Sequence, residues 1–292
     1  MRATLAMAGM PSFWRRTVDH VKRQTNMAVT LGGLTVPTKP YPLVQFNSPN
    51  IIDHCKAMSD RGIGGFSVAN LTYQAGNTPA LDMSRSAASL ILQTADPKPD
   101  EEPPHALFSG TVSTELPRND PSIQRTGFTG WRTRDMGFSA FGKVFWDLGQ
   151  YTYLVMRVKS DGRKYFVNIQ TDTIVPTDIH QHILPTRTPG QWETIAIPFS
   201  DFVRTNHGLV VEPQNEMQTM KVRSLGIGLT DRIQGPFELR IAEAYASNSS
   251  SKNVSKDSGF DLREQEEEEE PLGLMDTPQP KRKPGEPEQI LM

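Results

Sequence analysis

The sequence predicts an all-β domain, because short stretches of alternating apolar and polar residues recur through its middle. Turn-forming residues separate these stretches, and the 292-residue chain holds 23 prolines and 22 glycines. Between residues 41 and 246 few segments keep a helical period, and strands do not alternate with helices as a doubly wound fold requires. About eight to ten short strands are expected, which favours an antiparallel sandwich or barrel.

Three segments of the chain differ in charge. Residues 1–40 hold six basic residues and one acid, whereas residues 247–292 hold six basic and eleven acidic residues. The stretch 41–246 carries the remaining charge of −2. We therefore predict a basic head, a β-sandwich domain at 41–246 with a polar loop near 96–105, and a flexible, disordered acidic and proline-rich tail.

The basic head has the pattern of a mitochondrial targeting segment. No acid precedes Asp19, and apolar residues recur at helical spacing between Phe13 and Val21 with basic residues among them. Pro11 interrupts the pattern, so the helix is expected from Phe13 to Arg23. An ordinary solvated helix is the alternative. A secretory signal is not expected, since no long apolar run precedes a small-residue cleavage site.

The strands are predicted from period-two alternation, and they lie at 154–158, 165–169, 192–197, 225–229 and 237–241. Asp161 and Gly162 fall between the first two stretches, which predicts a β-hairpin joining them. Residues 82–94 fit either a helix or a pair of strands.

Residues that could carry chemistry are scattered. His180 and His182 could begin a metal site, but the sequence offers no third ligand. Cys55 is expected to be a buried, inert thiol. The glycines near Gly64 lack the spacing of a nucleotide-binding loop. Carboxylates that could form a glycosidase pair are weak candidates: Asp135, Asp147, Glu193 and Glu238. We expect no catalytic residue, cofactor or metal. Nucleic acid is disfavoured because the slightly acidic middle lacks a basic stripe.

Four motifs follow one another along the middle of the chain. They are Asp60-Arg61-Gly62-Ile63-Gly64-Gly65-Phe66-Ser67; Phe108-Ser109-Gly110 with Gly127-Phe128 and Trp131-Arg132; Asp147-Leu148 with 154–158 and Asp161-Gly162-Arg163-Lys164-Tyr165; and Trp192-Glu193-Thr194-Ile195 with Ile197-Pro198-Phe199 and Phe202. In order and spacing the set resembles the complex I intermediate-associated protein 30 family of NADH:ubiquinone oxidoreductase assembly factors, over roughly residues 43–246.

The resemblance implies a galactose-binding-like jelly-roll β-sandwich. It also implies a non-enzymatic, chaperone-like factor on the matrix side of mitochondria, which holds a membrane-arm intermediate of complex I. Its partners would be complex I assembly intermediates and other assembly factors, with no small-molecule substrate. Peripheral contact with the inner membrane stays open.

Phe128, Trp131 and Arg132 form the candidate partner-binding surface, because aromatic residues and arginine are enriched at protein interfaces. Trp131 lies in a glycine-punctuated stretch, so among the aromatic residues it is the better candidate for an exposed contact, against the edge of the core as the default position.

Two other functions remain open. A carbohydrate-binding module would use the same fold, and sequons at Asn70, Asn248 and Asn253 would suit secretion. A single cysteine and no expected signal peptide argue against that compartment. A small-molecule or metal enzyme built on His180 and His182 is the least favoured alternative.

Overall fold

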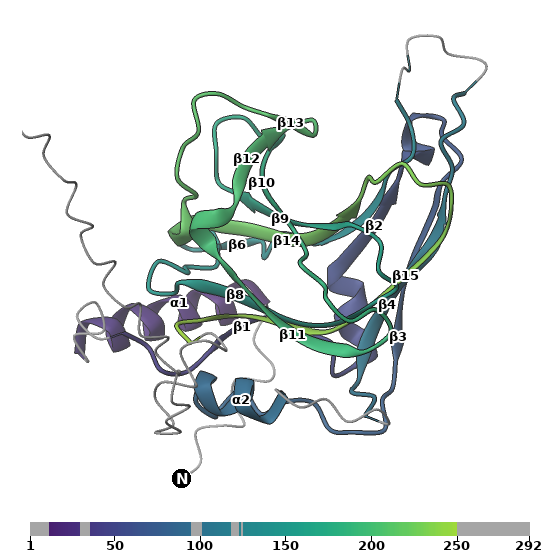
Figure 1. Cartoon of the computed structure of the whole chain (residues 1–292). Helices are drawn as coiled ribbons and strands as arrows, with labels where there is room; N and C mark the ends of the chain where they lie inside the picture. The colour runs from purple at the N-terminus through teal and green to yellow at the C-terminus, as the bar shows by residue number, and fades with distance from the viewer. Residues whose placement is uncertain (1–11, 30–35, 95–100, 118–122, 124, 250–292) are drawn as a thin grey trace, which may run out of the picture.

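The computed structural model describes residues 12–29, 36–94, 101–117, 123 and 125–249. Within them the chain forms two antiparallel β-sheets packed face to face, so the predicted jelly-roll β-sandwich is confirmed (Figure 1). Most of the predicted tail, at 250–292, and half of the predicted polar loop, at 96–100, lie outside the described residues.

Sheet A contains six strands in the order β11–β8–β15–β4–β3, with β1 also paired to β15. Their bounds are β1 (Tyr41–Gln45), β3 (Val68–Gln74), β4 (His105–Val112), β8 (Tyr153–Ser160), β11 (Trp192–Pro198) and β15 (Gly235–Ser247). One edge of β15 pairs with β4 along its first half and with β1 along its second. The other edge of β15 pairs with β8, so β15 is the centre of this sheet.

Sheet B contains seven strands in the order β13–β12–β10–β9–β14–β5–β2. Their bounds are β2 (Cys55–Ser59), β5 (Thr129–Thr133), β9 (Tyr165–Thr171), β10 (Asp178–Ile183), β12 (Val203–Asn206), β13 (Leu209–Val210) and β14 (Val222–Leu229). A separate small hairpin pairs β6 (Phe138–Ser139) with β7 (Gly142–Lys143). Four short 3-10 turns are η1 (Pro49–His54), η2 (Asp60–Ile63), η3 (Phe199–Asp201) and η4 (Thr219–Lys221).

The hydrophobic core fills the space between the two sheets. Alternate residues of each strand point to opposite faces, so one apolar set per strand turns inward. Leu154, Met156 and Val158 of β8 are buried in this core, and so are the apolar residues at alternate positions of β9. All five strands predicted from alternation lie within observed strands: β8, β9, β11, β14 and β15.

The predicted hairpin around Asp161 and Gly162 is wrong. β8 pairs with β11 and β15 in sheet A, whereas β9 pairs with β10 and β14 in sheet B. The turn, with Gly162 at a φ of 91°, therefore carries the chain from one sheet to the other. Both strands bury alternate residues in one shared core, which gives the same local pattern as a paired hairpin.

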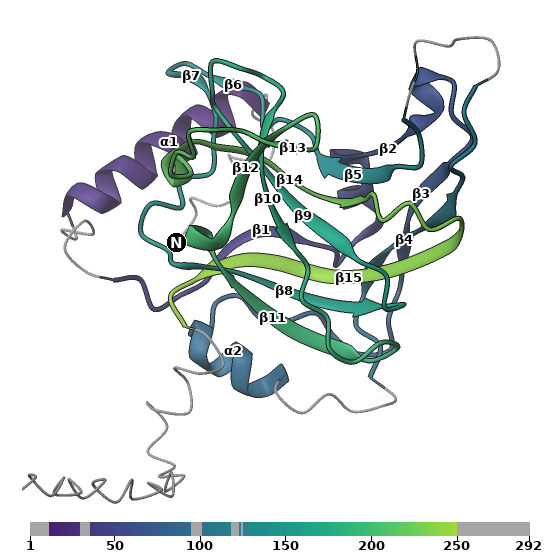
Figure 2. The same ribbon diagram turned by 45° about the horizontal axis from the view of Figure 1, so that its top comes forward.

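Two helices pack against the sandwich. α2 (Ala87–Thr94) covers the outer face of sheet A, and the Thr194 hydroxyl of β11 donates to that of Thr94 at 2.8 Å (Figure 1). The stretch 82–94 thus contains a helix and not a strand pair. α1 (Ser12–Val29) contains the predicted helix of the head and lies beside the β6–β7 hairpin (Figure 2). Among the described residues no helix combines the length and apolar character that a bilayer crossing needs.

Candidate partner-binding surface

Trp131 lies in the core and not on the surface. Its side chain is 1% exposed, and its ring packs edge-on against Phe46 with the centroids 5.7 Å apart. The expected exposure of this ring is therefore wrong, and the core alternative holds. The glycine before Trp131 reflects close strand pairing and not an exposed ring. A Cβ on Gly130 would stand 2.8 Å from the carbonyl oxygen of Ile227 on the paired strand.

Arg132 does not share the face of β5 on which Trp131 lies. Successive residues of a strand face opposite sides, so Arg132 points to the outer face of sheet B. Phe128 is partly buried just before the strand, and its carbonyl oxygen accepts a hydrogen bond from the Asp60 amide at 3.2 Å. Trp131 thus points into the core, whereas Arg132 reaches the outer face of the sheet. Its role in partner binding stays a prediction, as does that of Phe128.

A groove of about 210 Å³ lies beside Arg132 on the outer face of sheet B. It is lined by Met58, Trp131, Arg132, Asn168, Gln170, Pro176, Thr177, Ile179, Ser224 and Gly226. Gly226 lines the groove without a side chain. A Cβ at this position would lie 2.3 Å from the carbonyl oxygen of Trp131. Close pairing of β5 and β14 thus excludes a side chain at this point.

Two amide side chains, Asn168 and Gln170, line the groove. Arg132 Nη1 and Ser224 Oγ each donate to Gln170 Oε1 at 3.3 Å, and Gln170 Nε2 donates to the Pro176 carbonyl. Beside them, Gln181 Nε2 donates to Asn168 Oδ1 at 2.8 Å. These bonds hold the amide dipoles in fixed orientations. The amides were not among the residues predicted from the sequence. The alternation of polar and core residues at 166–170 is the signal that places Asn168 and Gln170 on an outer face.

The rim of the groove has a surplus of positive charge. Arg223 binds Asp135 through Nε at 2.8 Å and Nη2 at 2.5 Å, and Arg132 lies 3.7 Å from the same carboxylate. Hydrogen bonds from Arg223 hold the pKa of Asp135 below its ordinary value, which keeps it ionised. Two arginines share this one carboxylate, so the trio carries a net charge of +1. The positive rim suits an acidic group on a partner.

The groove presents hydrogen-bond donors, hydrogen-bond acceptors and one positive charge. The residues that line it in the described part of the chain include no carboxylate and no histidine. General acid–base catalysis needs such groups within hydrogen-bond reach of the reacting atoms. Donors and acceptors held by their neighbours are instead suited to recognising peptide groups.

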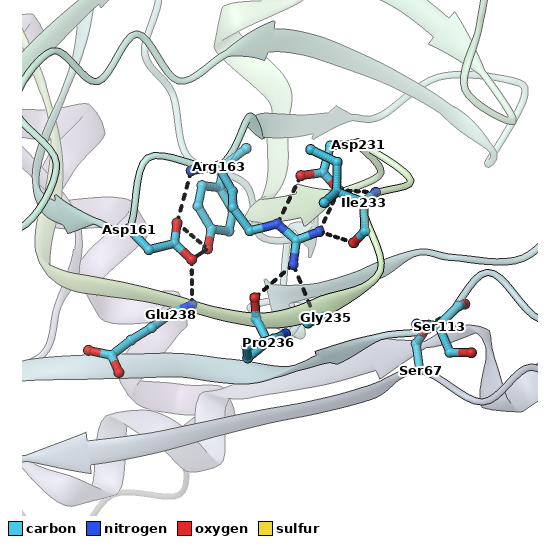
Figure 3. A network of polar contacts seen from close by, with 10 residues as sticks. Ser67, Ser113, Asp161, Arg163, Asp231, Ile233, Gly235, Pro236 and Glu238 are labelled. Carbon is cyan, nitrogen blue, oxygen red and sulfur yellow. Dashed lines mark hydrogen bonds and ion pairs between the residues drawn. The ribbon is translucent and has the colours of Figure 1, made fainter.

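Arg163 joins the turn after β8 to the loop before β15 (Figure 3). Its Nε and Nη2 donate to the two oxygens of Asp231 at 2.9 Å and 2.7 Å. The guanidinium also donates to the carbonyl oxygens of Ile233, Gly235 and Pro236. Burial alone would lower the pKa of Arg163, but the Asp231 carboxylate outweighs it and the net shift is upward. We call this pair the Arg163–Asp231 clamp, and its role is structural.

Asp161 fixes the same turn to β15 (Figure 3). Its carboxylate accepts from the Glu238 amide at 2.8 Å and from the Arg163 amide at 3.0 Å. The Tyr165 hydroxyl also donates to it, at 3.1 Å. Burial, with the nearby Asp161 charge, raises the pKa of Tyr165, so this hydroxyl stays a donor.

Asp60 organises the first motif. Its carboxylate is buried and accepts from the Ser67 amide at 2.9 Å, the Ser67 hydroxyl at 2.8 Å and the Gly127 amide at 2.7 Å. A Cβ on Gly65 would stand 2.4 Å from Asp60 Cγ, so only glycine fits there. The motifs that carry the family resemblance therefore include residues that stabilise the sandwich.

The remaining sequence candidates do not converge. His180 is buried, and burial together with Arg204 lowers its pKa. No group of three or more metal-ligating side chains occurs among the described residues. Cys55 is buried, and burial raises the pKa of its thiol to about 12. All four carboxylates have local partners: Asp135 binds Arg223, Asp147 accepts from the Gly149 amide, Glu193 accepts from the Arg187 amide, and Glu238 pairs with Arg240.

A buried acid lies on the opposite side of the molecule, on the outer face of sheet A. Glu243 is 2% exposed and its Oε1 has no hydrogen-bond partner among the described residues; the same holds for the buried Tyr245 hydroxyl. Arg157, its neighbour on β8, instead pairs with Glu101 at 3.0 Å. Burial raises the pKa of Glu243 to about 7, although Arg157 opposes the shift.

This raised pKa predicts a dependence of stability on pH. The ordinary pKa of a glutamate is 4.5. As pH rises from 4.5 to about 7, the Glu243 carboxyl loses its proton in the unfolded chain but keeps it in the folded chain. The free energy of unfolding therefore falls across that window and levels off above it. Glu243→Gln removes this loss of stability. The free energy of unfolding of the variant should therefore exceed that of the wild type by about 1–3 kcal/mol at pH 8 and equal it near pH 4.5. Urea unfolding at both pH values checks this, with exposed Glu216→Gln as the control. An equal gain at both values would contradict it.

Comparison with protein families gives one match over most of the chain. The family model described as complex I intermediate-associated protein 30 matches residues 44–241. The protein of Neurospora crassa named "Complex I intermediate-associated protein 30, mitochondrial" is 42% identical over 250 residues, which cover 85% of this chain and 87% of that protein. Proteins of the same name from Mus musculus and Drosophila melanogaster are 34% and 27% identical, over 47% and 67% of this chain and 42% and 59% of their own.

Solved structures with similar architecture are carbohydrate-binding modules. A family 11 module from Clostridium thermocellum, in complex with a mixed-linked tetrasaccharide, has a TM-score of 0.45 and 13% identity, covering 73% of this chain and 98% of its own. A second family 11 module, from a cellulosomal cellulase, has a TM-score of 0.46 and 14% identity, covering 73% and 96%. At this level of similarity neither structure says what this chain binds.

Proposed function

We propose that this chain, which belongs to the complex I intermediate-associated protein 30 family, is a non-enzymatic assembly factor that binds and stabilises a membrane-arm intermediate of mitochondrial respiratory complex I. Relatives named for mitochondria and for association with complex I intermediates support this. We place its action on the matrix side, together with other assembly factors. The predicted targeting role of the basic head belongs to the same proposal.

The groove beside Arg132 is the observation that carries a mechanism. Held amides on β9 and β10 offer donors and acceptors to a partner's peptide groups, and Arg132 offers a charge to an acidic side chain. Such a surface holds a partner without altering it chemically. We propose that an acidic, extended segment of the intermediate binds there.

Carbohydrate binding is not advanced as a second function. Sugar rings bind through exposed aromatic faces that stack on them. The one aromatic residue that lines the groove in the described chain is Trp131, which is buried. A glycan array on the purified protein tests the point directly, and specific binding there would reopen that function.

A gene knockout tests the assembly role. Mitochondrial complexes are separated on a native gel and stained for NADH dehydrogenase activity. We expect assembled complex I to be lost, membrane-arm intermediates to stall or disappear, and the other respiratory complexes to be spared. Normal complex I in the knockout would overturn the proposal.

Arg132→Glu tests the groove in the same knockout background. Reversing this charge should weaken capture of the membrane-arm intermediate by roughly tenfold and reduce assembled complex I. The partly exposed position predicts a change in folding stability of only about 0.5 kcal/mol. Co-purification of the intermediate with tagged protein measures binding, and thermal unfolding measures stability.

The matched control is Arg187→Glu, at an exposed position in the loop before β11. It makes the same charge change away from the groove lining, so assembly should stay at the wild-type level. If Arg132→Glu restores complex I as well as the wild type does, the groove is not the binding surface, whatever the knockout alone has shown.

A further inference from the structure

Helix α1 is held against the domain by one of its faces. Arg16 Nε donates to the Phe138 carbonyl at 3.0 Å, and the Ala140 amide donates to the Thr17 hydroxyl at 3.0 Å. His20 stacks on Phe141 with the ring centroids 5.1 Å apart. Positions three and four apart share a helix face, so these contacts define the docked face. A segment used only as an import signal would not need them.

A different face of α1 is apolar and open to solvent. Trp14, Val18 and Val21 are spaced i, i+4 and i+7, so they form one stripe along the helix. Trp14 is 55% exposed, and Val21 is exposed as well. Large apolar side chains gathered on one exposed face indicate an interaction surface.

The hairpin that holds α1 adds exposed aromatic rings. Phe141 is 63% exposed although His20 stacks on it, and Phe138 at the start of β6 is also exposed. Figure 2 shows the helix and the hairpin together at one corner of the molecule. The exposed rings therefore come from two elements that hydrogen bonds join.

The charge of the helix identifies the chemistry of the partner. The sequence of α1 contains four basic residues and one acid, and Arg15 directly follows Trp14. A basic helix with a tryptophan on its apolar face is typical of segments that lie in the headgroup region of a bilayer. Basic side chains beside the apolar stripe would meet lipid phosphates while the apolar groups enter the acyl boundary.

We propose that α1 and the β6–β7 hairpin form one lipid-binding surface, which seats the domain on an anionic bilayer with Trp14 and Val21 in the headgroup boundary. The inference deepens the proposed function and rests on it only for the identity of the membrane. It assigns a structural role, beyond targeting, to the helix of the basic head.

Tryptophan fluorescence reads this insertion directly. The chain has four tryptophans, and Trp131, Trp146 and Trp192 are buried, so Trp14 alone is accessible to lipid. The full chain is mixed with vesicles of equal parts phosphatidylcholine and phosphatidylglycerol, in which the phosphatidylcholine carries bromine on its acyl chains. We expect part of the emission to be quenched in the wild type and no quenching in Trp14→Phe, which should still bind vesicles.

Vesicle flotation measures the affinity. Trp14→Ser combined with Val21→Ser should weaken binding to the anionic vesicles by at least about tenfold. Arg15→Gln should weaken it by about fivefold and should not alter the docked face. Phe66 is 52% exposed on the segment after η2, outside this surface, so Phe66→Ser is the matched control and should bind like the wild type.

Four results would overturn the inference. They are a full chain that does not float with anionic vesicles, a double variant that binds as tightly as the wild type, no quenching by brominated lipid, or a mature mitochondrial protein that begins beyond Val21. The knockout separates the two proposals. Lipid binding by a protein whose loss spares complex I would reject the assembly role alone, whereas complex I loss with a protein inert to vesicles would reject the membrane surface alone.

Discussion

Asp231→Ala should lower the free energy of unfolding by about 3–5 kcal/mol, because it leaves the guanidinium of Arg163 in a largely buried site without its carboxylate. The two side chains are nearly enclosed, and the guanidinium is held in place by three backbone carbonyls. In the variant, the Arg163 guanidinium therefore cannot easily rotate to a position where water solvates it. Urea unfolding of the purified variant measures the loss.

An exposed ion pair on the neighbouring strand is the control for this experiment. Glu238 binds Arg240 at 2.8 Å with both side chains substantially exposed, so Glu238→Ala should cost less than about 1 kcal/mol. Replacing both clamp residues by apolar ones should recover part of the loss, since no buried charge then remains unpaired. Equal losses for Asp231→Ala and Glu238→Ala would show that the clamp stabilises the fold no more than an exposed ion pair does.

Trp131→Ala should also lower the free energy of unfolding by about 3–5 kcal/mol, because it removes a large ring from the core. Trp131→Phe keeps most of the volume and should cost less. Trp14→Ala replaces the same residue type at an exposed position, so folding should change by only about 0.5 kcal/mol. Thermal and urea unfolding of the three variants checks the order.

This result bears on the assembly function through protein abundance. Loss of complex I in cells carrying Trp131→Ala would follow from an unfolded protein and would not identify a contact. A Trp131→Ala protein as stable as the wild type, but unable to capture the intermediate, would contradict the buried position and return this ring to the partner surface.

The sequence predicted strands better than it predicted their partners. The alternation at 154–158 and 165–169 located β8 and β9 correctly, because each has one face in the core. Which sheet each strand joins depends on contacts with residues distant along the chain. Asp161 binds the Glu238 amide and Arg163 binds Asp231, and no local pattern around Gly162 reveals either contact.

The residues that meet in the groove also depend on contacts between segments distant along the chain. Arg132 lies on the outer face of sheet B, whereas its neighbour Trp131 points into the core. Glycines beside Trp131 suggested exposure, but Gly130 reflects the close approach of β14. The residues that line the groove come from β2, β5, β9, β10 and β14, so their convergence needed the order of sheet B. Residues from β9 and β10 become neighbours only through that order.

The central position of β15 fixes when this domain can fold. β15 is the last of the described strands along the chain, yet β1 pairs with no other strand, and β4 and β8 are joined through it alone. During synthesis, or during passage through a membrane from the N-terminus, the edges of β1, β4 and β8 that pair with β15 stay unpaired until β15 is available. Such late, long-range closure is slow and exposes the chain to aggregation until it is complete. A chain cut before residue 235 would hold two separate strand pairs in place of sheet A, so folding depends on delivery of the whole domain.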